Sequence, residues 1–462
     1  MKRVASQELA EQWAAAFPGF ADTLDEPASL RFLREEALAH FSDLGLPHAK
    51  LEAWRSTSLA PLERSAPSAP VDGSPDPQAL LATARRVLGD KPMLQEKAAR
   101  AVFVDGHLCP EASTLPGDAS PIAFSPIAFS PIAFSPTAHS DHAEPDSQIL
   151  PPGFGELASP KQDSFVALNT AFFNGGGLVE IGASASDDAP IHLLLISSGS
   201  AGLVCPRFLV RARAGSRATV VLDFVSEGSG EGLVNAVCEI FVEENASLDC
   251  VLLQREGSKA IHIGNLHSQQ QRGSQLRAHT VTLGGALVRN ALEAHLGDEG
   301  AEVDLRGLYI GSDDEHIDNH TLIDHALPHT ISRQVYKGVL GDRSRGVFRG
   351  LVHVRPNAQK IDSSQSNKNL LLSEKARIDT RPQLEIHADD VKCSHGSTVG
   401  KLDEEALFYL RSRGLSENDA RGLLTRGFTA EICEALPGQA LSDFVRDQAL
   451  AALSRCGTKE PT

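Results

Sequence analysis

The stretch from residue 381 to residue 400, RPQLEIHADDVKCSHGSTVG, holds the densest group of metal-binding and proton-exchanging side chains in the sequence. Apolar residues alternate with polar ones through it, which predicts a β-strand rather than a helix. Residues two apart in a strand point to the same face, so Cys393 and His395 project together. A thiolate and an imidazole on one face suit iron or zinc. The reactive groups are Glu385, His387, Asp389, Asp390, Cys393 and His395.

Cys393 and His395 supply two ligands, whereas a closed tetrahedral site needs four. No second Cys-x-His and no Cys-x-x-Cys occurs in the sequence. Two interpretations therefore stay open. The pair is either half of a site, or it is a strand end with a core cysteine and a surface histidine. The second arrangement is the commoner one, because free cysteine often behaves as a small core residue.

The elements that must position this pair are short strands. From about Phe165 to Gly400, brief apolar runs alternate with turn residues, and there is almost no helical periodicity. A polar or glycine turn followed by a strand recurs every 27 to 29 residues. One interval is 46 residues, which is close to the length of two such repeats, or coils. This period predicts a parallel β-solenoid, with a β-sandwich as the competing fold. The repeats start near Ala218, Ala246, Ser274, Ala301, Val347 and Ala376.

The sequence before this core predicts helices and then a linker. Apolar residues at helical spacing predict helices over 6–17, 28–43 and 77–88, and Trp13 and Trp54 are expected to pack in a core or an interface. From Ser120, three SPIAF units are followed by SPTAH. Proline at every fifth residue excludes helix and central strand there, so we expect an extended surface excursion.

The sequence after Gly400 returns to a helical pattern. Asp403 and Ser416 are expected to cap two helices, and a third follows the Pro437-Gly438 break. An apolar stripe on the second helix consists of Leu423, Leu424, Phe428 and Ile432. The expected organisation is an N-terminal helical region (1–109), a proline- and serine-rich linker (110–160), a β-helix core (161–400) and a C-terminal helical domain (401–462).

Four histidines cluster among aspartates at His316, His320, His325 and His329. On an unbroken strand, His316 and His320 share one face, and His325 and His329 share the other. A metal site and ordinary strand-surface histidines both remain open.

A basic segment follows in an otherwise acidic chain. It is either the ion-paired outer face of a solenoid or a contact for an anionic partner. Its members are Arg333, Tyr336, Lys337, Arg343, Arg345 and Arg349.

The net charge of −17, from 43 basic and 60 acidic residues, argues against nucleic acid or an anionic membrane as the main partner. The N-terminus has no apolar signal segment, and no run approaches the roughly 20 apolar residues of a membrane span. The seven scattered cysteines fit a cytoplasmic protein in a reducing compartment. No phosphate-binding loop of the GxxxxGK[ST] type occurs, so ATP hydrolysis would require another chain.

Several long runs resemble the SufB/SufD family of iron–sulfur cluster assembly scaffolds. They are SRQVYKGVL at 332–340, GVFRG at 346–350, NLLLS at 369–373, LFYLRSRGL at 407–415, and the stretch 381–400. GLPHAKLEAWRST at 45–57 and FVALNTAF at 165–172 extend the resemblance over most of the chain. It is strongest to the SufD branch, because the CSHG signature belongs there and Asn367 stands where SufB carries a cysteine.

This resemblance implies a right-handed parallel β-helix and a non-catalytic scaffold subunit of a SufBCD-type complex. It implies pairing with a SufB-like paralogue through the β-helices and docking of a SufC-like ATPase on the C-terminal helices. A nascent, transient iron–sulfur cluster would form at the partner interface, with His395 and Cys393 as the ligands from this side. Reduced flavin is implied as a possibility for the complex, and no stably bound cofactor is expected in the chain alone.

A β-helix enzyme acting on acidic polysaccharide is the alternative from a different class of function. It would use paired carboxylates such as Asp389 and Asp390. Adjacent strand residues point to opposite faces, however, and the expected core at 161–400 contains no tryptophan to stack on sugars.

Overall fold

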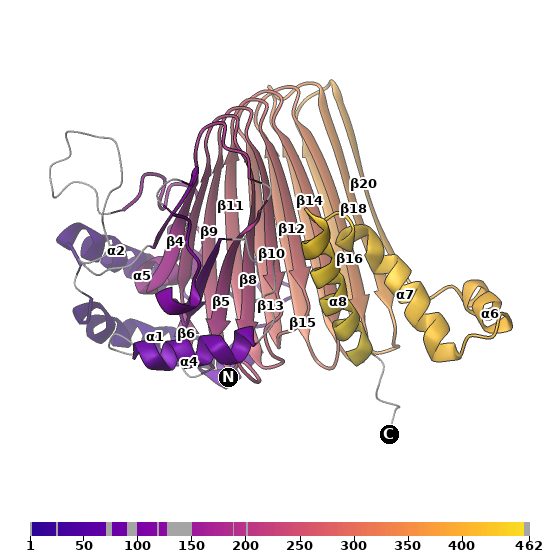
Figure 1. Ribbon diagram of the computed structural model, residues 1–462, viewed down its shortest axis with the longest axis horizontal. Coiled ribbons are helices and arrows are strands. Elements are labelled where there is room, and N and C mark those ends of the chain that lie inside the picture. Colours follow the sequence, from indigo (N-terminus) through magenta and orange to yellow (C-terminus); the bar gives the residue numbers. More distant parts are fainter. Residues whose placement is uncertain are drawn as a thin grey trace.

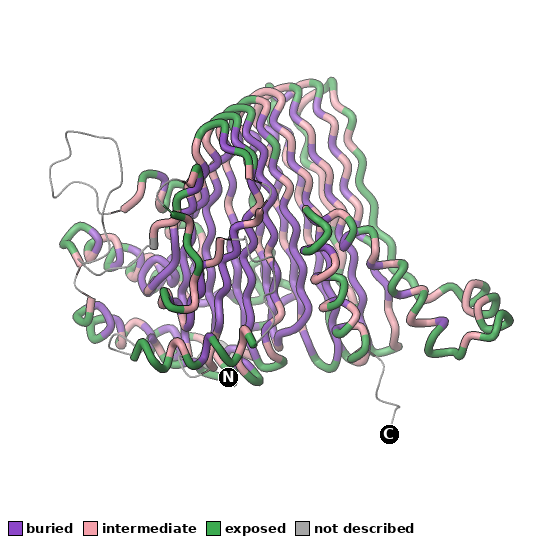
Figure 2. Tube along the Cα trace, in the orientation of Figure 1, coloured by how far each residue is buried: buried purple, intermediate pink, exposed green. Residues whose placement is uncertain are grey.

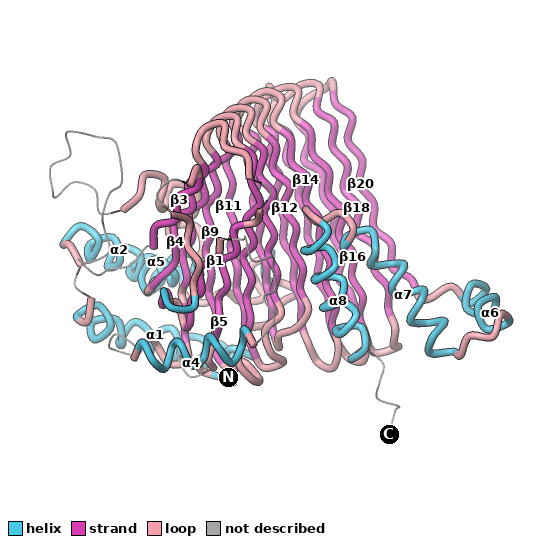
Figure 3. Tube along the Cα trace, in the orientation of Figure 1, coloured by secondary structure: helices cyan, strands magenta, loops and turns pink. Residues whose placement is uncertain are grey.

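The computed structural model describes residues 2–24, 26–70, 76–89, 99–117, 120–126, 150–187, 189–199 and 202–456. Strands fill the middle of the chain, and helices lie toward its two ends (Figures 1 and 3). From β7 to β20, successive strands alternate between two sheets, and each pairs in parallel with the strand two further along. This is the parallel β-solenoid predicted from the repeat.

The first sheet has the order β2-β1-β5-β8-β10-β12-β14-β16-β18-β20. Its strands are β1 (Arg100–Val104), β2 (His107–Leu108), β5 (Ile191–Ser197), β8 (Arg217–Ser226), β10 (Ser247–Gln254), β12 (Gln275–Thr282), β14 (Glu302–Gly311), β16 (Ile331–Leu340), β18 (Ile361–Leu371) and β20 (Val391–Gly400).

The second sheet has the order β19-β17-β15-β13-β11-β9-β7-β4-β3, with β6 (Leu203–Val204) beside β9. Its other strands are β3 (Ile122–Pro126), β4 (Gly175–Ile181), β7 (Pro206–Ala212), β9 (Gly232–Val242), β11 (Ala260–Gln270), β13 (Leu287–Leu296), β15 (His316–His325), β17 (Arg345–Val354) and β19 (Arg377–Ile386). The edge strand β3 thus combines the end of the first SPIAF unit with Ser125 and Pro126 of the second, and an edge position tolerates proline. The rest of the repeat, from residue 127 onward, lies outside the described residues.

The repeat seen in the sequence comes from a corner that recurs in every coil. Just before each strand of the first sheet, from β8 to β18, one residue has a positive φ, a left-handed conformation that favours glycine and asparagine. The last two coils place a histidine and a lysine there instead. These corner residues are Gly215, Asn245, Gly273, Gly300, His329 and Lys360.

One detail of the predicted repeat is wrong. The starts near Ala218, Ala246, Ser274 and Ala301 all belong to the first sheet, but Val347 lies in β17 and Ala376 just before β19, in the second sheet. The interval of 46 residues is therefore about one and a half coils rather than two. Both sheets have turns and strands of similar composition, so the sequence pattern alone did not distinguish them.

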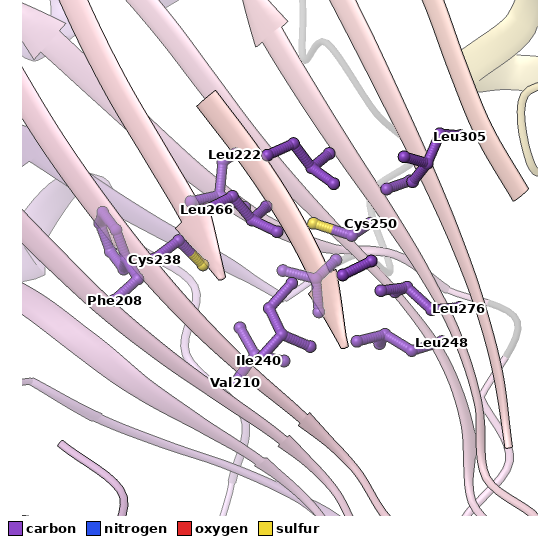
Figure 4. Packing of buried hydrophobic residues seen from close by; sticks show 14 of the residues in the cluster. Phe208, Val210, Leu222, Cys238, Ile240, Leu248, Cys250, Leu266, Leu276 and Leu305 are labelled. Atoms are coloured by element: carbon purple, nitrogen blue, oxygen red, sulfur yellow. The ribbon is translucent and has the colours of Figure 1, made fainter. Parts of the chain in front are cut away.

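The interior between the sheets is an aliphatic core in the early coils (Figure 4). In-register neighbours put similar side chains in one column, as with Leu248, Leu276 and Val303. Cys238 and Cys250 lie inside this core, from opposite sheets, and burial raises the pKa of both thiols. They behave as small apolar residues there.

The helix at Pro77–Leu88 packs against β1 and β5 of the first sheet, and the other N-terminal helices pack on the outer face of the second sheet. Trp13 and Trp54 are both buried in this cluster, as predicted, against Leu233, Ile261 and Leu287 from β9, β11 and β13. Residues 164–172 form a helix inside the segment expected to hold almost none, and the side chain of Asp163 caps it. The helices are α1 (Lys2–Asp22), α2 (Ala28–Leu44), α3 (Ala60–Ser65), α4 (Pro77–Leu88) and α5 (Ser164–Phe172), with short 3-10 turns at Glu52–Trp54 and Pro110–Ala112.

Three C-terminal helices follow the solenoid: α6 (Glu404–Ser412), α7 (Glu417–Cys433) and α8 (Gln439–Arg455). Asp403 and Ser416 cap α6 and α7 through their side chains, as the sequence predicts. Helices α7 and α8 pack on the outer face of the first sheet, whereas α6 projects away from the solenoid (Figure 1). Within the described ranges, no helix is both long and apolar enough to span a membrane.

Candidate functional site

The last coil of the solenoid has an open end. β20 pairs with β18 and β19 pairs with β17, and among the described residues no further strand covers either of them. The residues of β20 are mostly exposed, in contrast to the buried strands of the earlier coils (Figure 2). The free backbone edge of β20 can therefore pair with a strand of another protein.

The reactive stretch 381–400 is two strands in different sheets, not the single strand we expected. Residues 381–386 end β19, residues 387–390 turn a corner, and β20 begins at Val391. His387, Asp389 and Asp390 lie in the corner, so they do not share a strand face with Cys393 and His395. The part of the chain that the structure describes contains no group of three metal-capable side chains.

Cys393 and His395 lie on the inward side of β20. Their neighbours in β18 are Ser363 and Gln365, both buried in the interior. The Cys393 side chain is half-buried against the main core, and burial, with the nearby Asp362 charge, raises the pKa of its thiol. His395 is exposed. A thiol and an imidazole thus line one rim of the open end.

The interior becomes polar in the last coils, directly below these two residues. In the column that ends at Cys393, the aliphatic residues give way to hydroxyl groups: Ala218, Leu248, Leu276, Val303, Ser332, Ser363. In the column that ends at His395, they give way to carboxamides: Val220, Cys250, Ala278, Leu305, Gln334, Gln365.

Two buried hydrogen-bond chains run through these polar layers. The Gln365 amide donates to the Oε1 atom of Gln334 at 2.6 Å, and the Gln334 amide donates to Thr321 at 2.6 Å. In the second chain, the His325 ring lies 2.9 Å from the hydroxyl of Ser332, which donates to the hydroxyl of Ser363 at 2.8 Å. Burial lowers the pKa of His325 to about 4, so its ring is neutral.

Sequence reasoning missed these interior groups. Ser332 and Gln334, and then Ser363 and Gln365, put polar side chains at every second position of strands that point into the core. That period of two was present in the sequence, but a polar run such as DSSQSNKN resembles a loop. The same strand holds Asn367, which lies inside β18 and is buried.

The four histidines, all within the described residues, belong to no group of three or more metal-capable side chains. His316 and His320 point outward from β15 and His325 points inward, as predicted, while His329 is a corner residue. His316 and His320 flank Asp318, which is buried and paired with Arg289.

His316 and His320 lie on the outer face of the strand, as strand-surface histidines would, but they are half-buried. The N-terminal segment covers this face of β15, because the hydroxyl of Thr57 donates to Asp318 at 2.6 Å and lies 3.0 Å from the His316 ring. Arg289, which pairs with Asp318, also stacks over the Trp54 ring at 4.0 Å. These contacts fasten the N-terminal region to the solenoid.

The basic segment is an ion-paired face rather than a free cationic patch. Its arginines and lysine each have an acidic partner, and Tyr336 points into the core. The pairs are Arg333–Asp362, Lys337–Glu431, Arg343–Asp314, Arg345–Asp379 and Arg349–Glu52.

The side chains of the predicted apolar stripe on α7 do not all point in the same direction. Ile432 is buried and Phe428 is half-buried against the solenoid, Leu424 is half-buried, and Leu423 is 47% exposed. Phe408 and Tyr409 of α6 do not belong to the predicted stripe, yet they are 75% and 56% exposed. An exposed apolar surface therefore exists on the C-terminal helices, but it consists mainly of Phe408, Tyr409 and Leu423.

Comparison with known proteins gives consistent matches. Residues 195–428 match the family model described as the SUF system FeS cluster assembly SufBD core domain. The chain is 30% identical to the iron–sulfur cluster assembly protein SufD of Escherichia coli, over 92% of this chain and 93% of that protein. It is 30% identical to the SufBD family protein slr0076 of Synechocystis, over 89% of each. It is 33% identical to the SufBD family protein ML0594 of Mycobacterium leprae, over 66% of this chain and 79% of that protein.

Proposed function

Because the chain belongs to the SufBD family of iron–sulfur cluster assembly proteins, we propose that it is a SufD-like scaffold subunit that presents His395 and Cys393 to a nascent cluster. The observation that carries this proposal is the open end of the solenoid, where an imidazole and a thiol share the inward side of an uncovered strand. The cluster is the cargo of this process. It would be held transiently and completed by ligands from a second protein.

The free edge of β20 supports pairing with a SufB-like subunit. A strand with unpaired backbone groups is a ready template for a partner's strand. Pairing there would bring the partner's ligands to the rim occupied by Cys393 and His395. The pair would then be half of a shared site, which agrees with the first of the two interpretations of the sequence.

The C-terminal helices are the proposed docking surface for a SufC-like ATPase. Phe408, Tyr409 and Leu423 are exposed there, and large apolar side chains are typical anchors of protein interfaces. The sequence contains no phosphate-binding loop of the GxxxxGK[ST] type, so ATP hydrolysis would come from that partner. In this function the chain is not an enzyme and works in the cytoplasm.

The two candidate ligands would contribute different chemistry. His395 would bind metal through the lone pair of one ring nitrogen, as imidazole ligands do. Cys393 binds metal as a thiolate, and its raised pKa means that the proton must leave when the metal binds. Reduced flavin remains a proposal for the assembled complex. The polysaccharide alternative gains no support, because Asp389 and Asp390 lie in a corner and the family is one of assembly proteins.

Cluster assembly in cells with a single variant copy tests the function. With His395→Ala, the complex should still form but cluster assembly should fall at least tenfold. His387→Ala is the matched control, because this histidine is also exposed but lies in the corner before β20. Wild-type assembly in the His395→Ala strain would refute the role of His395.

Cys393→Ser separates chemistry from packing in the same strain. If Cys393 is a ligand, stability should hold while assembly fails. If Cys393 is only a core residue, the melting temperature should fall while assembly is retained. Co-purification of each variant with its partners is measured alongside, because loss of the complex would mean misfolding rather than loss of a ligand.

A further inference from the structure

The side chain of Gln365 lies directly below the proposed ligand His395. Gln365 of β18 is the in-register neighbour of His395 in β20, and Gln334 of β16 is its neighbour on the other side. Strands in a sheet are about 4.8 Å apart, and in-register side chains of a parallel sheet point the same way. Gln365 is only 3% exposed, so its polar atoms depend on protein partners.

The hydrogen bonds of Gln365 leave one atom without a partner. Its amide nitrogen donates inward to Gln334, whose own amide nitrogen donates onward to Thr321. The carbonyl oxygen Oε1 of Gln365 is buried and accepts no hydrogen bond from any described residue. A buried acceptor without a donor is costly, because it has lost water and gained nothing in return.

The imidazole of His395 is the donor best placed to satisfy this oxygen. It is the next side chain in the column, it is exposed, and rotation about its side-chain bonds requires no movement of the buried interior. Asp390, another acceptor near in sequence, cannot orient the His395 ring. It lies five residues earlier in the chain, about 16 Å away along the strand direction, and its own backbone contacts are in the corner.

We propose that Gln365 is the positioning residue for His395: its Oε1 atom accepts the N–H of the imidazole and aims the other ring nitrogen at the open end. This inference rests on the proposed function, in which that second nitrogen binds iron. Histidine ligands of metals commonly donate their other N–H to an acceptor that fixes the tautomer and the ring orientation. A carboxamide does this without burying a charge.

The experiment is nuclear magnetic resonance of the chain with isotope-labelled histidine rings, alone and in complex with its partners. The His395 signals are identified by their loss in His395→Ala. In the wild type, one ring nitrogen should carry the proton, and that proton should exchange slowly with water. In Gln365→Leu, the ring should show a mixture of tautomers and at least tenfold faster exchange. Gln365→Glu retains an acceptor and should keep one tautomer.

Asn367→Leu is the matched control. Asn367 lies in the same strand and points inward, and its amide donates to Tyr309 and to the Tyr336 carbonyl. Its replacement should disturb the interior at least as much and leave the His395 signals unchanged. An equal change in both variants would mean general loosening and would overturn the proposal. If Gln365→Leu does not fold, Gln365→Met replaces it, and the wild-type spectrum remains decisive.

The outcomes separate this inference from the proposed function. A freely exchanging His395 ring in the wild type, both alone and in the complex, overturns the role of Gln365 even if His395→Ala abolishes cluster assembly. A fixed ring together with normal assembly in the His395→Ala strain supports the hydrogen bond and refutes the ligand role.

Discussion

Glu315 is a buried carboxyl group that does not belong to the site and is expected to make stability depend on pH. It precedes β15 and accepts a hydrogen bond from the Ser312 backbone at 2.9 Å. Desolvation raises the pKa of Glu315 to about 7. The folded state therefore holds its proton more tightly than the unfolded chain, in which the pKa lies near 4.5. This group favours folding at low pH, and that contribution is lost as the pH rises from about 4.5 to 7.

Glu315→Gln should remove this loss. Relative to the wild type, we expect a gain of roughly 3 kcal/mol in unfolding free energy at pH 8 and little gain at pH 4.5, since the shift spans about 2.5 pKa units and each unit is worth about 1.4 kcal/mol. Chemical denaturation at both pH values measures it. The exposed Glu374 gives the charge-matched control, Glu374→Gln. Equal gains at the two pH values would contradict the explanation.

At the scale of elements, the junction between the N-terminal segment and β15 depends on Thr57. Its hydroxyl donates to the buried, ionised Asp318, and the Arg289 charge, with the hydrogen bonds to Asp318, keeps the pKa of that carboxyl low. Thr57→Val should lower the unfolding free energy by about 2 kcal/mol, because hydrogen bonds to charged groups are worth more than neutral ones. Thr398→Val, at an exposed threonine of β20, should change it little. A similar loss of unfolding free energy in the two variants would show that the Thr57–Asp318 contact does not hold the N-terminal segment on the solenoid.

The C-terminal helices provide the second prediction at this scale. Replacing Phe408, Tyr409 and Leu423 together with serine should weaken binding of the ATPase partner at least tenfold, since truncated interface aromatics often cost about 2 kcal/mol or more. Phe32→Ser, at a 66% exposed aromatic of α2, is the control. Binding of purified ATPase is measured by calorimetry. Unchanged affinity in the triple variant would place the docking surface elsewhere.

The elements also show what a sequence can predict. The solenoid was predictable because the left-handed corners require residues such as Gly273 and Gly300 at a fixed spacing. Helix α5 was not, because all of its residues are buried and it has no polar face to mark it. Which side of α7 faces the solenoid depends on tertiary packing. The sequence pattern alone therefore could not tell that Ile432 is buried and Leu423 is exposed.

For the whole molecule, the distribution of cysteines predicts that the isolated chain holds no stable cluster. Five of the seven cysteines are buried, only Cys238 and Cys250 of these lie in the same core, and among the described residues no three metal-capable side chains form a group. A cluster held by four cysteine thiolates needs all of them within one site. Iron and sulfide analysis of the anaerobically purified, partner-free protein should therefore give far less than one cluster per chain. Stoichiometric iron and sulfide would contradict this.

The change from an aliphatic to a polar interior has a consequence for the order of assembly. A solenoid that ended on bare leucine and valine would have to be covered while it folds, and its subunit would be an obligate oligomer. Here Gln334, Gln365 and Ser363 lie beneath the last strand, and their side chains tolerate water at the open end. If the chain pairs with a second subunit as proposed, it can complete its fold first, and the interface can then open and close again without either subunit unfolding.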